Sequence, residues 1–213
     1  MSGLQVTWFF LVGLLLTMYA ILDGFDLGVG ILHPFVAQND HERRLVMNII
    51  GPIWDGNEVW LVTFGGALFA AFPEAYATVF SGFYLAFMLL LLALIFRAVS
   101  MEFRSKRVSE SWRKTWDISF FLGSGLASFL FGVAVGDTLL GLPIGADMEF
   151  AGTFWGLLQP YGILVGVLVV TMFLMHGSIY LYLKTDGDLQ ARIHGWLRKT
   201  YIAFLVAYVA TSV

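Results

Sequence analysis

Four carboxylic acids lie inside sequence segments that are apolar enough to be membrane helices. Asp23 and Asp26 belong to the stretch ILDGFDLGVG, and Asp55 and Glu58 belong to the stretch GPIWDGNEVWL. A charge at bilayer depth costs free energy, so acids there usually face a protein interior and mark an ion or proton path. The chemistry that such carboxyl groups can perform is binding and releasing protons. The sequence therefore predicts a proton-transfer site formed by these four acids.

The same acids also have a structural interpretation. In that interpretation Asp23 and Asp55 only hydrogen-bond within the helix bundle and hold two helices together. Their partners would be each other or the side chains of Trp54, Trp60 and Asn57. The sequence alone leaves this alternative open.

The composition indicates a polytopic membrane protein. Of the 213 residues, 59% are hydrophobic and 13% are charged, whereas a soluble domain would have about 25% charged residues. The absence of cysteine excludes disulfides, thiolate metal sites and a cysteine nucleophile. The chain has no phosphate-binding loop, zinc-protease motif or serine-nucleophile motif, so a nucleotide site or a hydrolase is not expected. Nothing indicates a nucleic-acid partner.

Six segments approach or exceed the length of about 20 residues that spans a bilayer. They are residues 5–36, 45–72, 75–101, 115–141, 153–183 and 199–213. The expected fold is thus an all-α bundle of membrane helices. Pro52 opens the acidic part of the second segment and is expected to kink it. The sixth segment is short, which predicts that the chain is the first portion of a longer protein.

The basic residues predict the orientation in the membrane. All twelve lie in or beside the connections between segments 1–2, 3–4 and 5–6, and the other connections have none. Basic loops are typically cytoplasmic, so the N-terminus is expected outside. Both acid pairs would then share one depth in the inner half of the membrane. Asp23, Asp26, Gly30 and His33 would form one helical stripe that leads toward the cytoplasm.

Other candidate side chains have mostly interfacial interpretations. Arg97, near the end of the third segment, is expected to extend to the cytoplasmic interface. His33 lies near a span end, and His41 and His194 lie in loops, so solvated or interfacial imidazoles are expected there. His176 lies deeper and is a candidate haem ligand or relay group.

A weak internal repeat predicts the division of the chain. The sequence LVGLLLTMYAILDG at 11–24 is similar to LVGVLVVTMFLMHG at 164–177. The repeat predicts a first four-helix bundle over 1–150 and the start of a second bundle over 151–213. Gly24 and Gly28 have the spacing that lets two membrane helices pack closely.

Three motifs carry a resemblance to a known family. They are LDGFDLGVG at 22–30, GPIWDGNEVWL at 51–61 and GGALFAAFP at 65–73. The chain resembles subunit II of the cytochrome bd-type quinol oxidases, and the likeness continues through Trp116 and Asp117. It runs through nearly the whole chain, which would cover a little over half of the family subunit.

The resemblance implies a role in a respiratory complex. Such oxidases oxidise quinol (ubiquinol or menaquinol), reduce oxygen to water and take protons from the cytoplasm. Haem b, haem d and the quinol site are expected in subunit I, while subunit II supports it and delivers protons to the oxygen-reducing haem. Asp23 and Asp55 match acids of that route; Asp26 and Glu58 lie in the same motifs, which Gly24, Gly28, Trp54 and Asn57 would support.

The resemblance also implies partners and a location. The expected partners are the haem-bearing subunit I, small accessory membrane subunits and the lipid bilayer of a bacterial or archaeal inner membrane. This chain alone is not expected to be catalytic. An alternative is an ion-coupled secondary transporter, which also keeps paired carboxylates near mid-membrane and would need a broken helix. The Gly51, Pro52 and Gly56 region is the candidate break.

Overall fold

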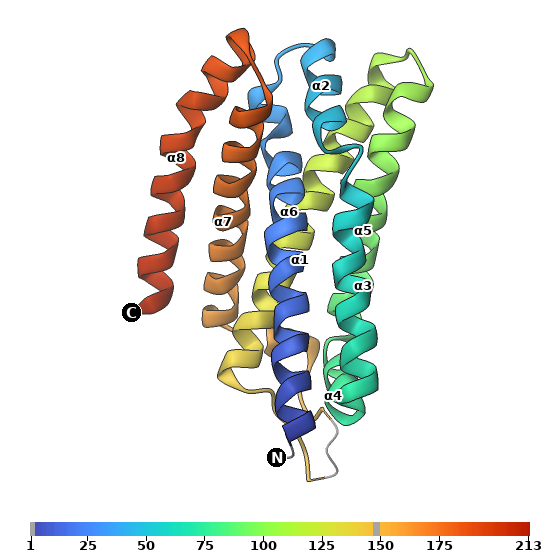
Figure 1. Cartoon of the computed structure of the whole chain (residues 1–213), viewed down its shortest axis with the longest axis vertical. Helices are drawn as coiled ribbons and strands as arrows, with labels where there is room; N and C mark the ends of the chain where they lie inside the picture. Colours follow the sequence, from blue (N-terminus) through green and yellow to red (C-terminus); the bar gives the residue numbers. More distant parts are fainter. Residues whose placement is uncertain (1–2, 147–149) are drawn as a thin grey trace.

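The structure of the chain, a computed structural model, describes residues 3–146 and 150–213. Its helices run side by side along one long axis (Figure 1). The α-helices of the described residues are α1 Gly3–Val36, α2 Asp40–Ile50, α3 Trp54–Ala71, α4 Pro73–Gly82, α5 Tyr84–Phe103, α6 Glu110–Leu140, α7 Pro160–Lys184 and α8 Gly187–Ser212. Two short 3₁₀ helices, η1 Arg104–Lys106 and η2 Phe154–Leu157, lie between them. The predicted all-α fold is confirmed.

Two of the segments that were predicted to be continuous are each divided into two helices. The segment 45–72 is interrupted between Ile50 and Trp54, because Pro52 lacks a backbone N–H and its ring clashes with the preceding turn. The segment 75–101 is interrupted at Phe83, where the backbone leaves the helical region while the ring stays buried. The first break agrees with the kink expected at Pro52. The second break has no proline in it, and the sequence did not predict it.

The last two segments begin elsewhere than the hydropathy pattern predicts. α7 begins at Pro160 rather than at 153, with proline at the first helical position, where its missing N–H costs nothing. α8 begins at Gly187 rather than at 199, because the polar residues before the apolar run are also helical.

Within the described residues, four helical stretches are long and apolar enough to cross a membrane. They are α1, the stretch Tyr84–Lys106, α6 and α7. This confirms a polytopic membrane protein. α3 and α8 carry more polar side chains and fall outside this group, so the six-span topology stays a prediction.

The basic residues gather at one end of the bundle. α2, η1 and the α7–α8 connection lie at that end, and the N-terminus and α4 lie at the other (Figure 1). We call the first of these the basic end. It is formed by α2, η1, the first turns of α6 and the α7–α8 connection, and it holds Arg43, Arg44, Arg104, Lys106, Arg107, Arg113, Lys114, Lys184 and Arg192.

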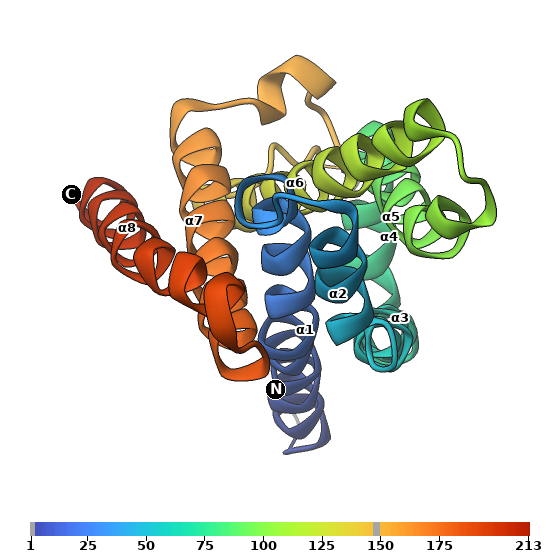
Figure 2. The same cartoon turned by 90° about the horizontal axis from the view of Figure 1, so that it is seen from above.

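α1 is the central helix of the bundle. It packs against α3, α6 and α7, whereas α8 packs mainly along α7 (Figure 2). α1 and α7 are in close backbone contact at Gly28 and Gly177, where a Cβ atom on Gly177 would lie 2.5 Å from the backbone carbon of Gly28. Contacts of α7 with α1 and α6 join the two parts of the chain. The division at residue 150 stays a prediction.

Candidate functional site: a buried ion pair between α1 and α5

Asp23 on α1 and Arg97 on α5 form an ion pair that is completely buried. Arg97 Nη2 lies 2.7 Å from Asp23 Oδ1, and Nη1 lies 3.3 Å from Oδ2. Both side chains are 0% exposed. Two parallel N–H to oxygen bonds fix the carboxylate in the plane of the guanidinium group. The pair therefore places one negative and one positive charge at a defined point inside the bundle.

The expectation that Arg97 extends to the membrane interface is wrong. α5 continues to Phe103 beyond it, so Arg97 lies within the helix rather than at its end. Its guanidinium group is buried in the bundle. Asp23 supplies a counter-charge and hydrogen-bond acceptors in place of the water that would solvate the guanidinium group at the interface, and this makes the burial possible.

Glu58 and Trp54 on α3 complete the surroundings of Arg97. Glu58 Oε2 lies 3.7 Å from Arg97 Nη1, and its side chain is 21% exposed. The Arg97 guanidinium carbon lies 6.0 Å from the centre of the Trp54 ring, within the range of a cation–π contact. Arg97 thus joins acids of two helices, and Glu58 is the member of the group that keeps some access from outside the chain.

Asp26 lies one turn along α1 from Asp23 and is held by an amide. Asn57 Nδ2 donates to Asp26 Oδ2 at 2.8 Å and to the Leu22 carbonyl at 3.2 Å. Asp26 is 0% exposed, and its Oδ1 is buried without a hydrogen-bond partner among the described residues. Within the described residues Asp26 forms no ion pair, and a buried carboxyl group without one is costly to keep charged.

Asp55 is not part of this group. Its side chain is exposed on α3, and the direct contact with Asp23 considered from the sequence is not formed. The residues of α3 that turn toward α1 and α5 are Trp54, Asn57 and Glu58. Three of the four predicted acids, Asp23, Asp26 and Glu58, are therefore brought together, and the fourth faces away from the bundle.

The predicted stripe on α1 faces the interior along its whole length. Asp23, Asp26, Gly30 and His33 are all buried. His33 is 0% exposed, so the interfacial position expected for it is wrong. The reason is Asp117 on α6, whose Oδ1 lies 3.6 Å from His33 Nε2 and gives the imidazole a polar neighbour inside the bundle.

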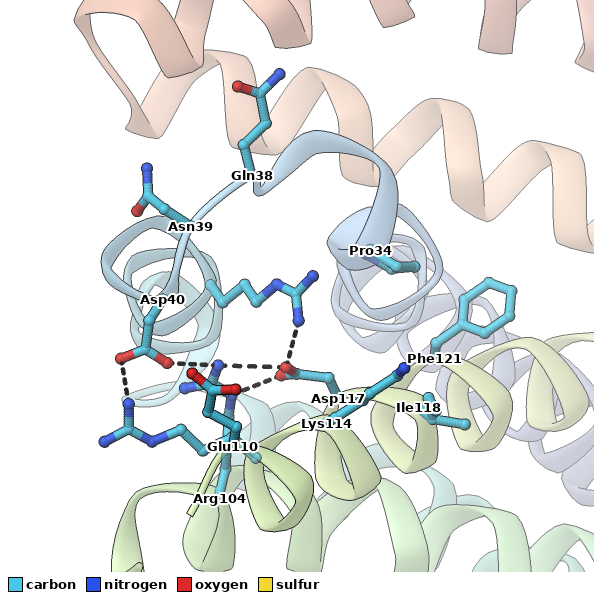
Figure 3. A pocket seen from close by; sticks show the side chains of 12 residues that line it. Pro34, Gln38, Asn39, Asp40, Arg104, Glu110, Lys114, Asp117, Ile118 and Phe121 are labelled. Atoms are coloured by element: carbon cyan, nitrogen blue, oxygen red, sulfur yellow. Dashed lines mark hydrogen bonds and ion pairs between the residues drawn. The ribbon is translucent and has the colours of Figure 1, made fainter. Parts of the chain in front are cut away.

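A second charged cluster surrounds Asp117 at the basic end (Figure 3). Arg104 donates to Asp117 from Nε at 2.5 Å, and Arg43 donates from Nη1 at 2.8 Å. Arg104 Nη2 and Arg113 Nη1 each lie 2.9 Å from a carboxylate oxygen of Asp40. Sequence reasoning missed both Arg97 and Asp117 as interior groups. The available signals were a single arginine in an apolar run and an acid in an apolar helix.

The two histidines inside the bundle, His33 and His176, have different neighbours. His33 is enclosed beside Asp117, and His176 packs edge-on against the Phe25 ring with 5.5 Å between the ring centres. Among the described residues, no three His, Asp or Glu side chains are grouped so that they could hold a metal ion. The site around Arg97 consists of carboxyl, guanidinium and amide groups.

Acids and an arginine buried between apolar helices define a polytopic membrane protein with a polar, ion-paired interior. Its sequence gives the particular family. The chain belongs to the cytochrome bd terminal oxidase subunit II family, whose model matches residues 4–213. This confirms the resemblance carried by the two acidic motifs.

Individual relatives agree with that family. The chain is 44% identical over 214 residues to cytochrome bd-I ubiquinol oxidase subunit 2 of Escherichia coli (strain K12). It is 43% identical over 210 residues to cytochrome bd ubiquinol oxidase subunit 2 of Bacillus subtilis (strain 168). These matches cover 99% of this chain but 56% and 62% of the relatives, so the chain spans little more than half of their length.

A solved structure shares the fold. A chain of the bd oxidase from Geobacillus thermodenitrificans superposes with a TM-score of 0.81 at 18% sequence identity, over 99% of this chain and 66% of that chain. The transporter alternative finds no support in these comparisons.

Proposed function

We propose that this chain is part of the second subunit of a bd-type quinol oxidase. In the complex, quinol oxidation is coupled to the reduction of oxygen to water, with haem b and haem d held by subunit I. The chain supports that subunit and carries protons from the cytoplasm toward the oxygen-reducing haem. The basic end faces the cytoplasm of a bacterial cell, as the distribution of Lys and Arg favours.

The observation that supports this proposal most directly is the meeting of acids from two family motifs: Asp23 and Glu58 lie at the buried Arg97, and Asp26 lies one helical turn from Asp23 on Asn57. Asp23 and Arg97 form a completely buried ion pair, which sets a fixed electrostatic environment at this point. Asp26 and Glu58 are the groups that exchange protons. Asp26 accepts a hydrogen bond from the Asn57 amide on one carboxyl oxygen, and its other oxygen is buried without a partner among the described residues. Glu58 keeps partial access from outside the chain.

The polar groups between this site and the basic end lie along α1. Ser124 of α6 is 0% exposed, packs directly against Gly30, and has an Oγ with no hydrogen-bond partner among the described residues. His33 lies one turn further along α1 and approaches Asp117 at the basic end. We place the inward part of the proton path on this line, from His33 past Ser124 to Asp26.

Asp55 acts in this proposal from the outer face of α3. Its exposure in the chain favours a position against another subunit rather than in the interior of this bundle. Proton transfer between Asp55 and Glu58, which are three residues apart on α3, would link the outer face to the buried group.

The visible absorbance spectrum of the purified membrane complex containing this chain tests the proposed function. Bands of b-type and d-type haem, together with a co-purifying haem-bearing subunit, are the expected result. A colourless complex that contains the intact chain would contradict the assignment.

A further inference from the structure

A cavity of about 560 Å³ opens at the basic end between α1, α2 and α6 (Figure 3). Four basic side chains line it: Arg43, Arg104, Arg113 and Lys114. Asp23, Asp26 and Glu58 are not among the residues that line it. The cavity is therefore separate from the proposed proton-exchanging groups. Its basic lining at one end of a membrane bundle indicates a site for an anion.

The cavity has more hydrogen-bond donors than acceptors. Its three acids, Asp40, Glu110 and Asp117, leave one net positive charge on the lining. Arg43 and Arg113 each give only Nη1 to a carboxylate and remain 32% and 29% exposed, so most of the five N–H donors of each guanidinium group have no carboxylate partner.

The remaining basic side chains of the cavity add to this excess. Arg104 is 2% exposed, and its Nη1 is buried without an acceptor among the described residues. Lys114 is exposed, and the structure shows no ion pair or hydrogen bond for its amino group within the described ranges. An added group that brings acceptor oxygens and negative charge would satisfy these donors.

Two helices begin beside the same cavity. α2 begins beside it at Asp40, and α6 begins beside it at Glu110. A helix N-terminus carries a partial positive charge that favours anions. The helix ends therefore act in the same direction as the arginines.

An apolar groove of about 350 Å³ adjoins the cavity between α5 and α6. Its lining includes Leu92, Phe96, Leu122 and Leu126, and Ile118 lines both the groove and the cavity. Ile118 and Leu122 are 48% and 58% exposed. The basic cavity and the exposed apolar groove thus border the same side chain, Ile118, on a helix long and apolar enough to cross a membrane.

We propose that this end of the bundle binds an anionic glycerophospholipid, with its phosphate group in the basic cavity and an acyl chain in the α5–α6 groove. Basic pockets between membrane helices at the cytoplasmic surface are suited to lipid head groups. A free phosphate ion would meet the same guanidinium groups but would leave the adjoining groove without an occupant. The position of the groove beside the cavity, with Ile118 lining both, favours the lipid.

Lipid titration of the delipidated membrane complex containing this chain tests the proposal. Phosphatidylglycerol, phosphatidylcholine and inorganic phosphate are added separately, and the thermal unfolding of the chain is followed. We expect phosphatidylglycerol alone to raise the unfolding temperature. Lys114→Gln should weaken its apparent affinity about fivefold, and the Arg113→Gln/Lys114→Gln variant further, since each basic side chain near a lipid surface contributes about 1 kcal/mol.

Two matched variants complete the experiment. Lys106→Gln removes a positive charge at the same end from an exposed residue outside the cavity, and it should leave the affinity unchanged. Ser119→Phe fills part of the groove and should weaken phosphatidylglycerol binding without removing a charge. Native mass spectrometry of the complex should show the same order of lipid retention.

Three results would overturn the proposal. They are unchanged phosphatidylglycerol affinity in the double variant, an equal effect of phosphatidylcholine, and the same stabilisation by inorganic phosphate alone. The last result would show a free-anion site. Because the readout is lipid binding rather than oxygen reduction, it does not depend on whether the proposed oxidase function holds.

Discussion

Asp23 and Arg97, which are 74 positions apart in the sequence, meet with both guanidinium Nη atoms directed at both carboxylate oxygens. The pair joins α1 to α5 in the middle of the bundle. Because both side chains are fully buried, neither can lose its partner without leaving an unpaired charge away from water.

Asp23→Leu is therefore expected to destabilise the chain by about 3–5 kcal/mol, since it leaves Arg97 buried without its main counter-ion. The double variant Asp23→Leu/Arg97→Met should recover most of this loss. Thermal unfolding of the four proteins of the double-mutant cycle measures the coupling. Additive effects of the two single changes would show that the pair contributes no interaction energy.

Asp26→Asn tests proton transfer with little structural change, because Asn57 Nδ2 can donate to the new amide oxygen as it does to the carboxylate. We expect oxygen consumption by the complex to fall about tenfold or more, while haem content stays normal. Asp188→Asn, at an exposed acid in the first turn of α8, is the control. Full turnover in Asp26→Asn would leave Asp26 a structural residue.

Asp55→Asn distinguishes the outer face of α3 from the bundle interior. The side chain is exposed, so the substitution should leave the thermal stability of the isolated chain within about 0.5 kcal/mol of the wild type. If Asp55 passes protons to Glu58 at a subunit interface, turnover of the complex should nevertheless fall. Unchanged turnover would remove Asp55 from the path.

Gly28→Ala should loosen the contact between α1 and α7. A Cβ atom on Gly28 would meet the backbone carbonyl of Phe173, and backbone cannot move aside as a side-chain end can. We expect a loss of about 1–3 kcal/mol in thermal unfolding. Gly13→Ala, on the same helix with no atom near its added Cβ, should be neutral, and an equal loss there would refute the packing argument.

Glu42 gives the basic end a defined pH dependence. The backbone N–H of Gln38 donates to its carboxylate at 2.7 Å, and together with Arg192 it lowers the pKa of Glu42 below its ordinary value. A lowered pKa stabilises the folded chain above the unfolded pKa, and this contribution is lost as the pH falls through the folded pKa. The stability difference between wild type and Glu42→Gln should thus begin to shrink as the pH falls below the unfolded pKa of about 4.3, and it should vanish only below the lowered folded pKa. A difference that persisted in acid would exclude the carboxylate as its source.

Local sequence patterns predicted the parts of the site that depend on one helix. The stripe from Asp23 to His33 follows from helical spacing, and the break at Pro52 follows from proline chemistry. Hydropathy likewise identified α1, α6 and α7 as apolar spans. These features are decided within a few turns of chain, where periodicity carries the information.

The rest of the site depends on contacts between distant segments. Arg97 has the sequence context of a span end, and only the approach of Asp23 makes its burial possible. Asp55 and Glu58 have the same spacing as Asp23 and Asp26. Asp23 and Asp26 are both buried, whereas Asp55 is exposed and Glu58 approaches Arg97. This difference depends on how α3 is rotated about its axis after the break at Pro52, which turns Asn57 and Glu58 toward α1 and α5. No pattern within α3 specifies that rotation.

α8 packs along α7 and meets α1 mainly near Arg192, whose Nε donates to the Val36 carbonyl at 3.3 Å. Beyond Thr200, which hydrogen-bonds to Ser178 on α7, most of its side chains are exposed. A helix with one supporting neighbour opens more readily than one enclosed on several sides. In amide hydrogen exchange, the part of α8 after Thr200 should therefore exchange as a separate cooperative unit, well before the enclosed second half of α1.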